Sequence, residues 1–303
     1  MSHATGFVRE STLLNFVILF TITHRNLSLR KIFWSLPVSW RYTARRMYYL
    51  LPDIWEGATG QRDALTPPRG MIFTGSGDFR KQGRELTEIL KDTGGLQPHH
   101  RVLDIGSGMG RIATGLTEYL NEQGSYEGFD VMERGVKWCQ ANITTRFPDF
   151  KFRYVPLKND LYRADGTDAA DFRFPYADEE FDFVVLTSVF THMMPAEVKH
   201  YLGEIERVLK SGGTCFATFF LLNKEAKEGM QNNKEFNFPY DYGHYRLMND
   251  EIKSANIAFE IDYLKKELIT ANNLKAEALH LGWWCGRERK NCVSFQDIAV
   301  LRK

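Results

Sequence analysis

Cysteine is scarce in this chain, with four residues among 303, and none forms a C-x-x-C pair or lies beside a cluster of histidines. Structural zinc sites and disulfide frameworks both depend on such spacings, so we expect neither, and no metal site. Reduced thiols favour a reducing compartment, which predicts a cytoplasmic protein. The four residues are Cys139, Cys215, Cys285 and Cys292.

Long apolar runs are scarce as well. The apolar stretch at residues 13–22 is about half the roughly 20 residues that a membrane-spanning helix needs, and Asn15 interrupts it. A secretory signal is not expected, because Arg9 stands beside Glu10 before the stretch and no small-residue cleavage site follows it. We therefore expect no membrane-spanning segment.

An excess of charge of one sign is the third absence. The chain carries 39 Lys and Arg against 38 Asp and Glu, and no Lys/Arg-rich block occurs in its last three quarters. Nucleic-acid-binding domains carry a basic patch or stripe, so no nucleic-acid partner is expected. With 43% hydrophobic residues, the composition suits one large globular domain with an extension.

The first 66 residues differ from the rest and are predicted to form a helical extension. Residues 25–46 hold six Lys and Arg and no acid, and apolar residues recur there at helical spacing with Trp34, Trp40 and Tyr42 between them. A basic amphipathic segment can lie on an anionic membrane, which predicts peripheral membrane contact through residues 11–50. The alternative is that the apolar face packs on the main domain, or on a partner subunit in a homo-oligomer.

From residue 67 to 303 strand-like runs alternate with helix-periodic segments, which is typical of an α/β fold with a mostly parallel, doubly wound sheet. The last two strands are separated by a short polar stretch, which predicts a hairpin and an antiparallel edge. Seven strands are expected, at residues 101–105, 126–131, 150–155, 181–188, 214–222, 274–283 and 293–301.

Residues 101–111, RVLDIGSGMGR, place three glycines where the first strand gives way to the first helix. Ligands bind at this edge of open α/β sheets, and glycines let the backbone approach them closely. The loop departs from the dinucleotide motif G-x-G-x-x-G, because Arg111 takes the place of its last glycine. Asp104, just before the loop, suits a ligand with an amino group and a sulfonium better than a pyrophosphate.

Three further stretches accompany this loop: Asp130, 20 residues after Gly110, then FPYADEEFDFVVLTSVFTHM (174–193), then RVLKSGGT (207–214). Together they resemble the small-molecule class I S-adenosylmethionine-dependent methyltransferases over residues 95–303. The resemblance implies a Rossmann-like fold, S-adenosylmethionine as the cofactor, and methyl transfer as the activity.

The resemblance also implies roles for individual residues. Gly106, Gly108 and Gly110 are expected to lie against the methionine and ribose of the cofactor, and Asp104 near its amino group. Asp130 is expected to bind the ribose hydroxyls, since a carboxylate accepts from both. Val131, with Met132, is expected to flank the adenine.

Other positions carry over less directly. Asp160, with Asn159, is the nearest match to the family's adenine-side residue, or else a loop carboxylate in water. Thr187 and Ser188, where the fourth strand ends, are expected to touch the cofactor. Residues 71–83 are rich in glycine and either cover the cofactor or form a plain turn.

Methyl transfer to a hydroxyl needs a proton acceptor, and His192, just beyond the fourth strand, is the predicted general base, because its ordinary pKa of about 6.5 suits that role near neutrality. The alternative is that His192 caps the next helix or shapes the pocket. His244 is a second candidate, within a predicted lid-like insert near residues 223–250.

The predicted function is methyl transfer to a hydroxyl of a small-molecule, glycan or lipid-linked acceptor. Two alternatives stay open: N-methylation of an amine head group at a membrane, and a non-catalytic cofactor-binding interaction protein.

Overall fold

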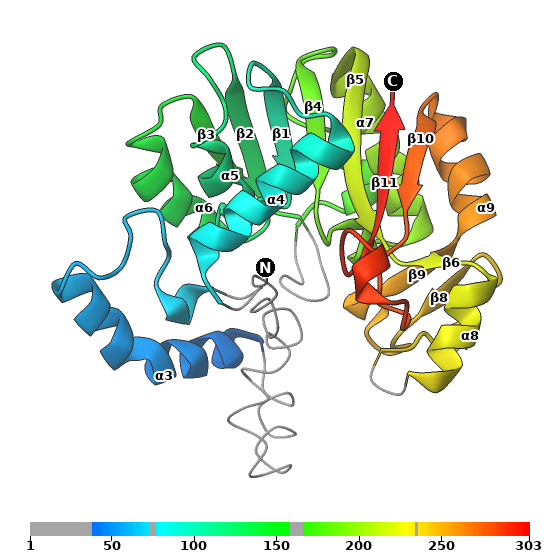
Figure 1. Cartoon of the computed structure of the whole chain (residues 1–303), viewed down its shortest axis with the longest axis horizontal. Helices are drawn as coiled ribbons and strands as arrows, with labels where there is room; N and C mark the ends of the chain where they lie inside the picture. Colours follow the sequence, from blue (N-terminus) through cyan, green and yellow to red (C-terminus); the bar gives the residue numbers. More distant parts are fainter. Residues whose placement is uncertain (1–37, 73–76, 158–165, 234–235) are drawn as a thin grey trace, which may run out of the picture. The chain divides into compact units, whose positions relative to one another are not determined.

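The computed structural model describes residues 38–72, 77–157, 166–233 and 236–303 (Figure 1). The chain divides into two compact units, residues 1–84 and 85–303. The predicted domain boundary after residue 66 stays a prediction. Of the predicted membrane segment, residues 11–37 lie outside the described residues.

A helical extension is present in the first unit, where α3 spans Val38–Ala58 and the 3-10 turn η1 spans Arg69–Met71. The two are tied by Asp53, whose carboxylate accepts hydrogen bonds from the backbone N–H of Arg69 (2.6 Å) and of Gly70 (3.0 Å). Arg62 adds an ion pair to Asp53 at 3.6 Å. The acidic side of α3 is therefore held against its own unit.

The second unit is built on a seven-stranded sheet of order β10-β11-β5-β4-β1-β2-β3. Strands β1 to β5 are parallel, while β11 runs antiparallel to both of its neighbours, β5 and β10. The doubly wound, mostly parallel sheet with an antiparallel strand near its edge is thus confirmed. The strands are β1 Arg101–Ile105, β2 Ser125–Asp130, β3 Phe150–Tyr154, β4 Phe181–Leu186, β5 Leu209–Phe219, β10 Lys275–His280 and β11 Asp297–Arg302.

Helices cover the sheet, and several of them are short. The segment after β2 changes from α-helix to π-helix at Gln140, and the one that begins at Ile261 changes at Leu264. The helical elements of the second unit, with α4 beginning in the first, are α4 Phe79–Gly94, α5 Arg111–Leu116, α6 Glu133–Cys139, η2 Gln140–Thr144, η3 Ala169–Asp171, η4 Phe190–His192, α7 Pro195–Val208, α8 Lys224–Asn232, η5 Lys253–Ala255, α9 Ile261–Tyr263, η6 Leu264–Ile269, η7 Thr270–Asn272 and η8 Arg289–Asn291.

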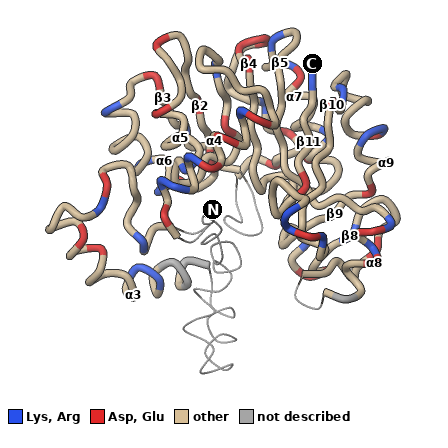
Figure 2. Tube along the Cα trace, in the orientation of Figure 1, with Lys and Arg blue, Asp and Glu red and all other residues tan. Residues whose placement is uncertain are grey.

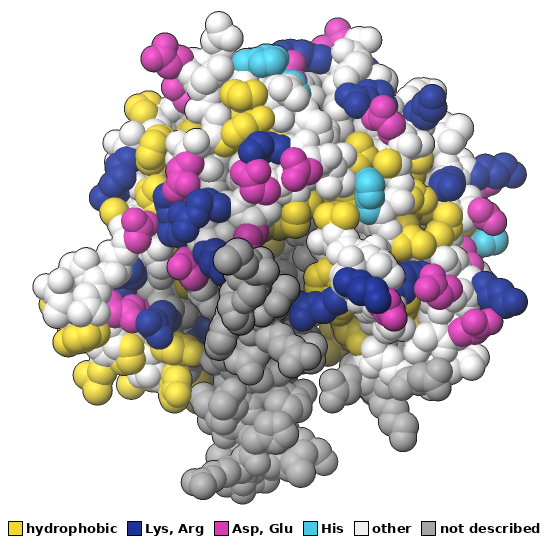
Figure 3. All heavy atoms as spheres, in the orientation of Figure 1, with side chains coloured by type: hydrophobic (Ala, Val, Ile, Leu, Met, Phe, Trp, Pro, Cys, Tyr) yellow, Lys and Arg dark blue, Asp and Glu magenta, His cyan; other side chains and the backbone are white. Residues whose placement is uncertain are grey.

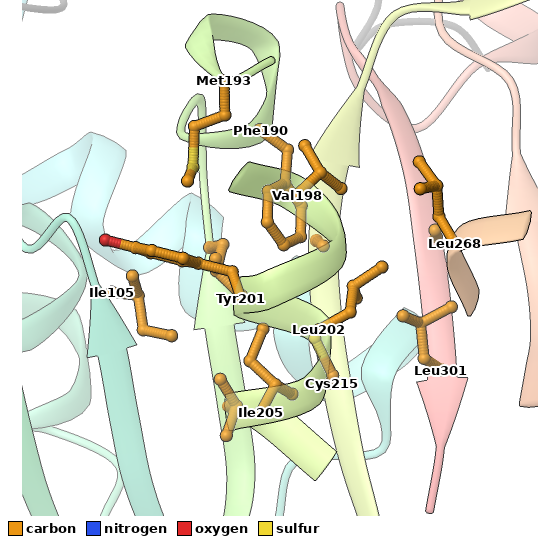
Figure 4. Close-up of a cluster of buried hydrophobic side chains, with 14 of the residues drawn as sticks. Ile105, Phe190, Met193, Val198, Tyr201, Leu202, Ile205, Cys215, Leu268 and Leu301 are labelled. Carbon is orange, nitrogen blue, oxygen red and sulfur yellow. The ribbon is translucent and has the colours of Figure 1, made fainter. Parts of the chain in front are cut away.

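Both faces of the sheet are buried, as side chains of β4 show. Val184 and Leu186 join a large apolar cluster with α7, in which Tyr201 and Leu202 lie over the sheet (Figure 4). Phe183 points the other way, because a Cβ built on Gly94 of α4 would lie 2.8 Å from the Phe183 ring. A parallel sheet covered on both faces leaves the carboxyl ends of its strands as the place for a ligand.

The fifth strand differs from its prediction at both ends. It begins at Leu209, because Phe181 pairs with Leu209 and Phe183 with Thr214, so the residues between form a bulge. Gly212, with φ of +76°, accommodates that bulge. The predicted strand at 214–222 therefore starts earlier and leaves the sheet after Phe219.

A second sheet of order β6-β9-β8-β7 follows β5 directly and was not predicted. It lies at the carboxyl ends of the parallel strands (Figure 1), and the predicted lid-like insert supplies α8 and two of its strands. Its strands are β6 Leu221–Leu222, β7 Tyr240–Asp241, β8 Tyr245–Leu247 and β9 Ile257–Glu260.

One fully buried carboxylate, Asp297, joins the two sheets. It accepts hydrogen bonds from the backbone N–H of Leu221 (2.6 Å) and Gly282 (2.7 Å) and from Trp284 Nε1 (2.6 Å). Arg287 Nη1 lies 3.6 Å away and supplies a compensating charge. Burial raises the pKa of Asp297 to about 6, against the lowering effect of these donors. The carboxylate thus binds both the start of β6 and residues 282–284, which precede β11.

Charges of both signs are interspersed along the second unit (Figure 2). Across the ranges that the structure describes, no helix combines the length and the hydropathy that crossing a membrane requires. All four cysteines are free, and three of them are buried.

Candidate active site

The glycine loop begins where β1 ends, and it is held by the neighbouring strands. The carbonyl of Phe129 at the end of β2 accepts hydrogen bonds from the N–H groups of Gly106 (2.9 Å) and Ser107 (3.1 Å). Gly106 has φ of +80°, and a Cβ there would lie 2.5 Å from Cγ2 of Val189. Only glycine combines that backbone conformation with such a close approach, so the loop after β1 lies directly against the loop after β4.

Gly108 differs from its neighbours because nothing within the described structure lies within 4 Å of a Cβ built on it, although its φ is +55°. Its backbone thus faces open space on the side where a ligand could approach. Gly110, with φ of +74°, caps the start of α5. A Cβ on Gly110 would lie 2.7 Å from Cδ1 of Ile143, so this glycine serves packing.

Asp130, the last residue of β2, is bound to this loop. Its Oδ2 accepts from the backbone N–H of Gly108 (2.8 Å), and its Oδ1 accepts from that of Met132 (2.7 Å). The side chain is nearly buried, and burial raises its pKa, while the two backbone donors act to lower it. Each oxygen keeps acceptor capacity for a second donor. Val131, the next residue, is half-buried and packs on the apolar core.

Asp104 is almost fully buried one strand away. Its Oδ2 accepts a hydrogen bond from the hydroxyl of Tyr126 (2.6 Å), whereas its Oδ1 and the hydroxyl of Ser107 have no hydrogen-bond partner among the described residues. Burial raises the pKa of Asp104 to about 7, and the neighbouring Asp130 adds to that rise. Buried polar groups without partners are rare. A cationic ligand with N–H groups would satisfy Asp104 and favour its charged form.

Thr187 and Ser188 follow β4 at the same edge of the sheet. Ser188 is exposed and adopts φ of +59°, a conformation that is costly for a residue with a side chain and that concentrates at functional sites. Its N–H donates to the hydroxyl of Thr218 (2.8 Å), and its own hydroxyl donates to Gln296 (3.0 Å). Ser188 is therefore engaged by protein groups, while Thr187 is half-buried.

His192 ends the turn η4, three residues after Val189, the residue that touches Gly106. Its Nδ1 lies 2.8 Å from the carbonyl oxygen of Ser254 in η5. A carbonyl only accepts, so Nδ1 must carry the proton and the neutral ring keeps its basic lone pair on Nε2. Burial lowers the pKa of His192, and the hydrogen bonds to the backbone act against that shift. The hydrogen bond thus fixes a proton on Nδ1, and burial favours the neutral form of the ring.

The other predicted positions lie elsewhere. His244 is exposed in the turn between β7 and β8, where its ring stacks on that of Tyr263 at 4.7 Å. Asp160 and Asn159 lie outside the described residues, as do residues 73–76 of the glycine-rich stretch 71–83. In the part of the chain that the structure describes, no group of three or more His, Cys, Asp or Glu is placed to hold a metal ion.

Three residues of this site were not found from the sequence. Tyr126 shares one face of β2 with Asp130, and the strand alternation could have placed it beside Asp104, because residue 104 pairs with residue 128. Val189 and Ser254 gave no such signal. Ser254 reaches His192 across 62 residues of chain, through a loop whose course no local pattern encodes.

Comparison with known proteins shows which proteins this chain resembles. A family model described as a methyltransferase domain matches residues 103–217, from β1 to β5. An uncharacterized protein of Haemophilus influenzae is 30% identical over 136 residues, which are 45% of this chain and 48% of that protein. Arsenite methyltransferase of Mus musculus is 27% identical over 135 residues, which are 44% of this chain and 34% of that enzyme. The chain therefore spans about half the length of these relatives or less.

Among solved structures, the 1,6-didemethyltoxoflavin-N1-methyltransferase of Burkholderia thailandensis, with bound 1,6-didemethyltoxoflavin and S-adenosylhomocysteine, is similar. It has a TM-score of 0.48 and 17% sequence identity, and the match covers 88% of this chain and 91% of that one.

Proposed function

Residues 103–217 match a methyltransferase domain, and on that premise we propose that the chain is a class I S-adenosylmethionine-dependent methyltransferase. We propose further that it methylates a hydroxyl of a small-molecule, glycan or lipid-linked acceptor, with His192 as the general base. The observation that carries the proposal is the bond from His192 Nδ1 to the Ser254 carbonyl. It fixes the tautomer whose Nε2 can accept a proton, beside the loop that touches Gly106.

The residues of the site fit the cofactor. Asp104 offers a buried carboxylate oxygen that has no partner within the described chain, suited to an amino group. Gly108 offers open space at its Cα, and Asp130 offers an oriented carboxylate for two hydroxyls. When bound, S-adenosylmethionine supplies a methyl group already activated by its sulfonium.

The groups around His192 suit an acceptor hydroxyl. The hydroxyls of Thr191 and Ser254 are buried, and neither has a hydrogen-bond partner in the described parts of the chain. Thr191 precedes His192 in the chain, and the carbonyl of Ser254 accepts the hydrogen bond from the His192 ring. The two hydroxyls can therefore orient a polar acceptor while His192 takes its proton. A hydroxyl is a weak nucleophile until its proton is taken, whereas a neutral amine already carries a reactive lone pair, so an oriented histidine favours O-methylation.

The proposal predicts a labelled O-methyl product. Purified full-length protein is incubated with S-adenosylmethionine labelled in its methyl group and with fractionated cell extract, and the labelled product is isolated. We expect the label on an ether or ester oxygen by mass spectrometry. Label on nitrogen would replace the proposal by N-methylation, and cofactor binding without any labelled product would favour the non-catalytic interaction protein.

A second prediction concerns Asp130. Asp130→Ala should weaken binding of S-adenosylhomocysteine by about 1.5–3 kcal/mol, because hydrogen bonds to a charged acceptor contribute at that level. Isothermal calorimetry measures the change. Glu133→Ala removes an exposed carboxylate three residues later, which pairs with Lys137 at 2.8 Å, and should leave affinity within about 0.5 kcal/mol. Equal affinities for Asp130→Ala and wild type would rule out the ribose role.

A further inference from the structure

The backbone of Ser188 is held in a costly conformation directly after β4. Its φ of +59° lies in the left-handed region, which residues with a side chain seldom adopt. The hydroxyl of Thr218, a buried residue of β5, accepts a hydrogen bond from the N–H of Ser188 at 2.8 Å and so stabilises this conformation. The Ser188 hydroxyl in turn donates to Oε1 of Gln296 at 3.0 Å. Because such strain concentrates at functional sites, the contact with Gln296 is a candidate for its function.

Gln296 lies at the ligand-binding edge of the large sheet, although it is distant from Ser188 in the chain. Strand β11 runs antiparallel to β5, and Asp297 pairs with Phe219, the last residue of β5. Figure 1 shows the start of β11 at the same end of the large sheet as the second sheet. Gln296, which precedes Asp297, is therefore placed beyond the carboxyl end of β5, where open α/β sheets bind ligands.

The backbone of Gln296 is fixed by its neighbours on both sides. A Cβ built on Gly282 would lie 2.6 Å from both the carbonyl carbon and the carbonyl oxygen of Gln296, so only glycine permits this approach. The next residue, Asp297, accepts hydrogen bonds from three N–H donors. The position of Gln296 is thus set before any ligand arrives, which is what a residue that orients a ligand requires.

One half of the Gln296 carboxamide is occupied and the other half is open. Its Oε1 accepts from Ser188, whereas its Nε2 donates to no residue in the ranges that the structure describes. The side chain is half-buried, and an amide nitrogen carries two donors. The open half of Gln296 is therefore a neutral donor of fixed orientation, which suits an oxygen atom of a ligand.

Surface charge gives no competing signal on the face of the second unit that Figure 3 shows. Side chains of Lys and Arg lie near those of Asp and Glu on that face, with hydrophobic side chains among them. A patch of one sign would attract a charged acceptor from a distance, but mixed charges do not. Recognition of an acceptor on this face thus depends on individual polar groups.

The strand order separates Gln296 from the residues assigned to the cofactor. Asp104 and Asp130 belong to β1 and β2, whereas Gln296 precedes β11. The end of β4, which His192 follows, lies between these two groups in the order β11-β5-β4-β1-β2. Along this edge the general base therefore has the cofactor residues on one side and Gln296 on the other, which is the side left for the acceptor.

We propose that Gln296 is a specificity-determining residue for the acceptor, with its Nε2 donating a hydrogen bond to an oxygen that neighbours the hydroxyl to be methylated. Ser188 is the positioning residue, because its hydroxyl orients the carboxamide. The inference rests on the proposed function and narrows its acceptor to a molecule in which two oxygen atoms lie close together.

A dilution series of the extract fraction that the wild-type protein labels tests the role of Gln296. Methyl-labelled S-adenosylmethionine is kept saturating, and the labelling rate against the amount of fraction gives a half-saturating amount and a maximal rate. Gln296→Ala should raise the half-saturating amount about threefold to tenfold and keep the maximal rate within about threefold, because a hydrogen bond to the bound acceptor is lost. Loss of the general base should instead lower the maximal rate.

Gln296→Glu separates the open donor from the bond to Ser188. A carboxylate still accepts from the Ser188 hydroxyl but offers no N–H, so a purely structural role predicts wild-type labelling. The proposal predicts that the half-saturating amount rises more than about tenfold, because the acceptor oxygen then meets another acceptor. Gln123→Glu makes the same change at an exposed glutamine before β2, at the opposite edge of the sheet, and should leave both quantities within about twofold.

Ser188→Gly tests the positioning residue. Glycine adopts the left-handed conformation without strain but lacks the hydroxyl. The half-saturating amount should therefore rise about threefold or more, while the thermal midpoint stays within about 2 °C because relief of strain offsets the lost hydrogen bond. A lowered thermal midpoint with unchanged labelling would show that Ser188 serves folding alone.

The remaining outcomes separate this inference from the proposed function. A half-saturating amount that is unchanged in Gln296→Ala, or lowered in Gln296→Glu, would overturn the role of Nε2 and leave the proposed function in place. Calorimetry should show S-adenosylhomocysteine affinity within about twofold of wild type for Gln296→Ala; a loss as large as that in labelling would assign the side chain to the cofactor. If the wild-type protein labels no fraction, the proposed function fails, and this inference fails with it.

Discussion

Replacing His192 by alanine is expected to lower kcat by about 10²–10⁴-fold, the usual contribution of a general base. The affinity for S-adenosylhomocysteine should stay within about twofold, because the hydrogen bonds of Asp104 and Asp130 do not involve the imidazole. Steady-state kinetics and calorimetry on the same preparation measure the two quantities. A loss confined to kcat is the mark of an interaction made only in the transition state.

The pH dependence follows from the environment of the ring. A general base must be neutral, so the wild-type rate should rise with pH as His192 loses its proton and then level off. Burial lowers the pKa of His192 from its ordinary value of 6.5, so the midpoint of this rise should lie below 6.5. The residual activity of His192→Ala should lack this limb of the profile.

His244→Ala is the matched control. His244 is exposed and stacks on Tyr263, so its loss should leave kcat within about twofold. If His192→Ala keeps most of its activity, the base is His244 or the acceptor is an amine that needs none. If kcat and cofactor affinity fall together, His192 shapes the pocket instead.

Asp297→Ala is expected to lower the free energy of unfolding of the second unit by about 3–5 kcal/mol, because three buried N–H donors lose their acceptor at about 1–3 kcal/mol each. The substitution leaves the N–H groups of Leu221, Gly282 and Trp284 without their buried acceptor, while Arg287 keeps its ion pair with Glu225 at 2.7 Å. Each unsatisfied donor carries a desolvation cost. Urea unfolding followed by far-ultraviolet circular dichroism measures the change.

Asp178→Ala gives the comparison for an exposed carboxylate. Asp178 pairs with Arg207 at 2.8 Å, but its side chain is 68% exposed, so its loss should cost at most about 1 kcal/mol. Should Asp297→Ala fail to fold, Asp297→Asn keeps the volume and one acceptor and should unfold at an intermediate urea concentration. A loss below about 1 kcal/mol for both Asp297 variants would contradict the role of this carboxylate.

The parts of the fold that the sequence could predict are those set by neighbours in the chain. Pro195 at the first position of α7 and the apolar residues that follow it define that helix locally. The positive φ at Gly106, Gly108 and Gly110 agrees with the prediction of a loop at 106–110. Asp130 was expected to bind the ribose hydroxyls, which stays a prediction; in the structure its carboxylate accepts a hydrogen bond from the N–H of Gly108.

The parts that escaped prediction depend on pairings distant in the chain. Leu221 and Leu222 read as the end of a continuous strand, because their apolar character is the same in either sheet. They lie in the second sheet because they pair with Phe259 and Glu260, and because the N–H of Leu221 donates a hydrogen bond to Asp297. Likewise the carbonyl of Ser254 selects the tautomer of His192, and a carbonyl group is present at every residue, so no side-chain pattern announces it.

The strand order also governs when the sheet can form during synthesis. β11 is made after β10, yet it lies between β10 and β5. Until residues 297–302 have left the ribosome, β5 presents an unpaired edge and β10 has no neighbour in this sheet. Asp297, the residue that joins the two sheets, arrives with the same segment. A nascent chain that already carries the whole glycine loop therefore still exposes a strand edge open to wrong partners, and the last strand to emerge is the one that closes it.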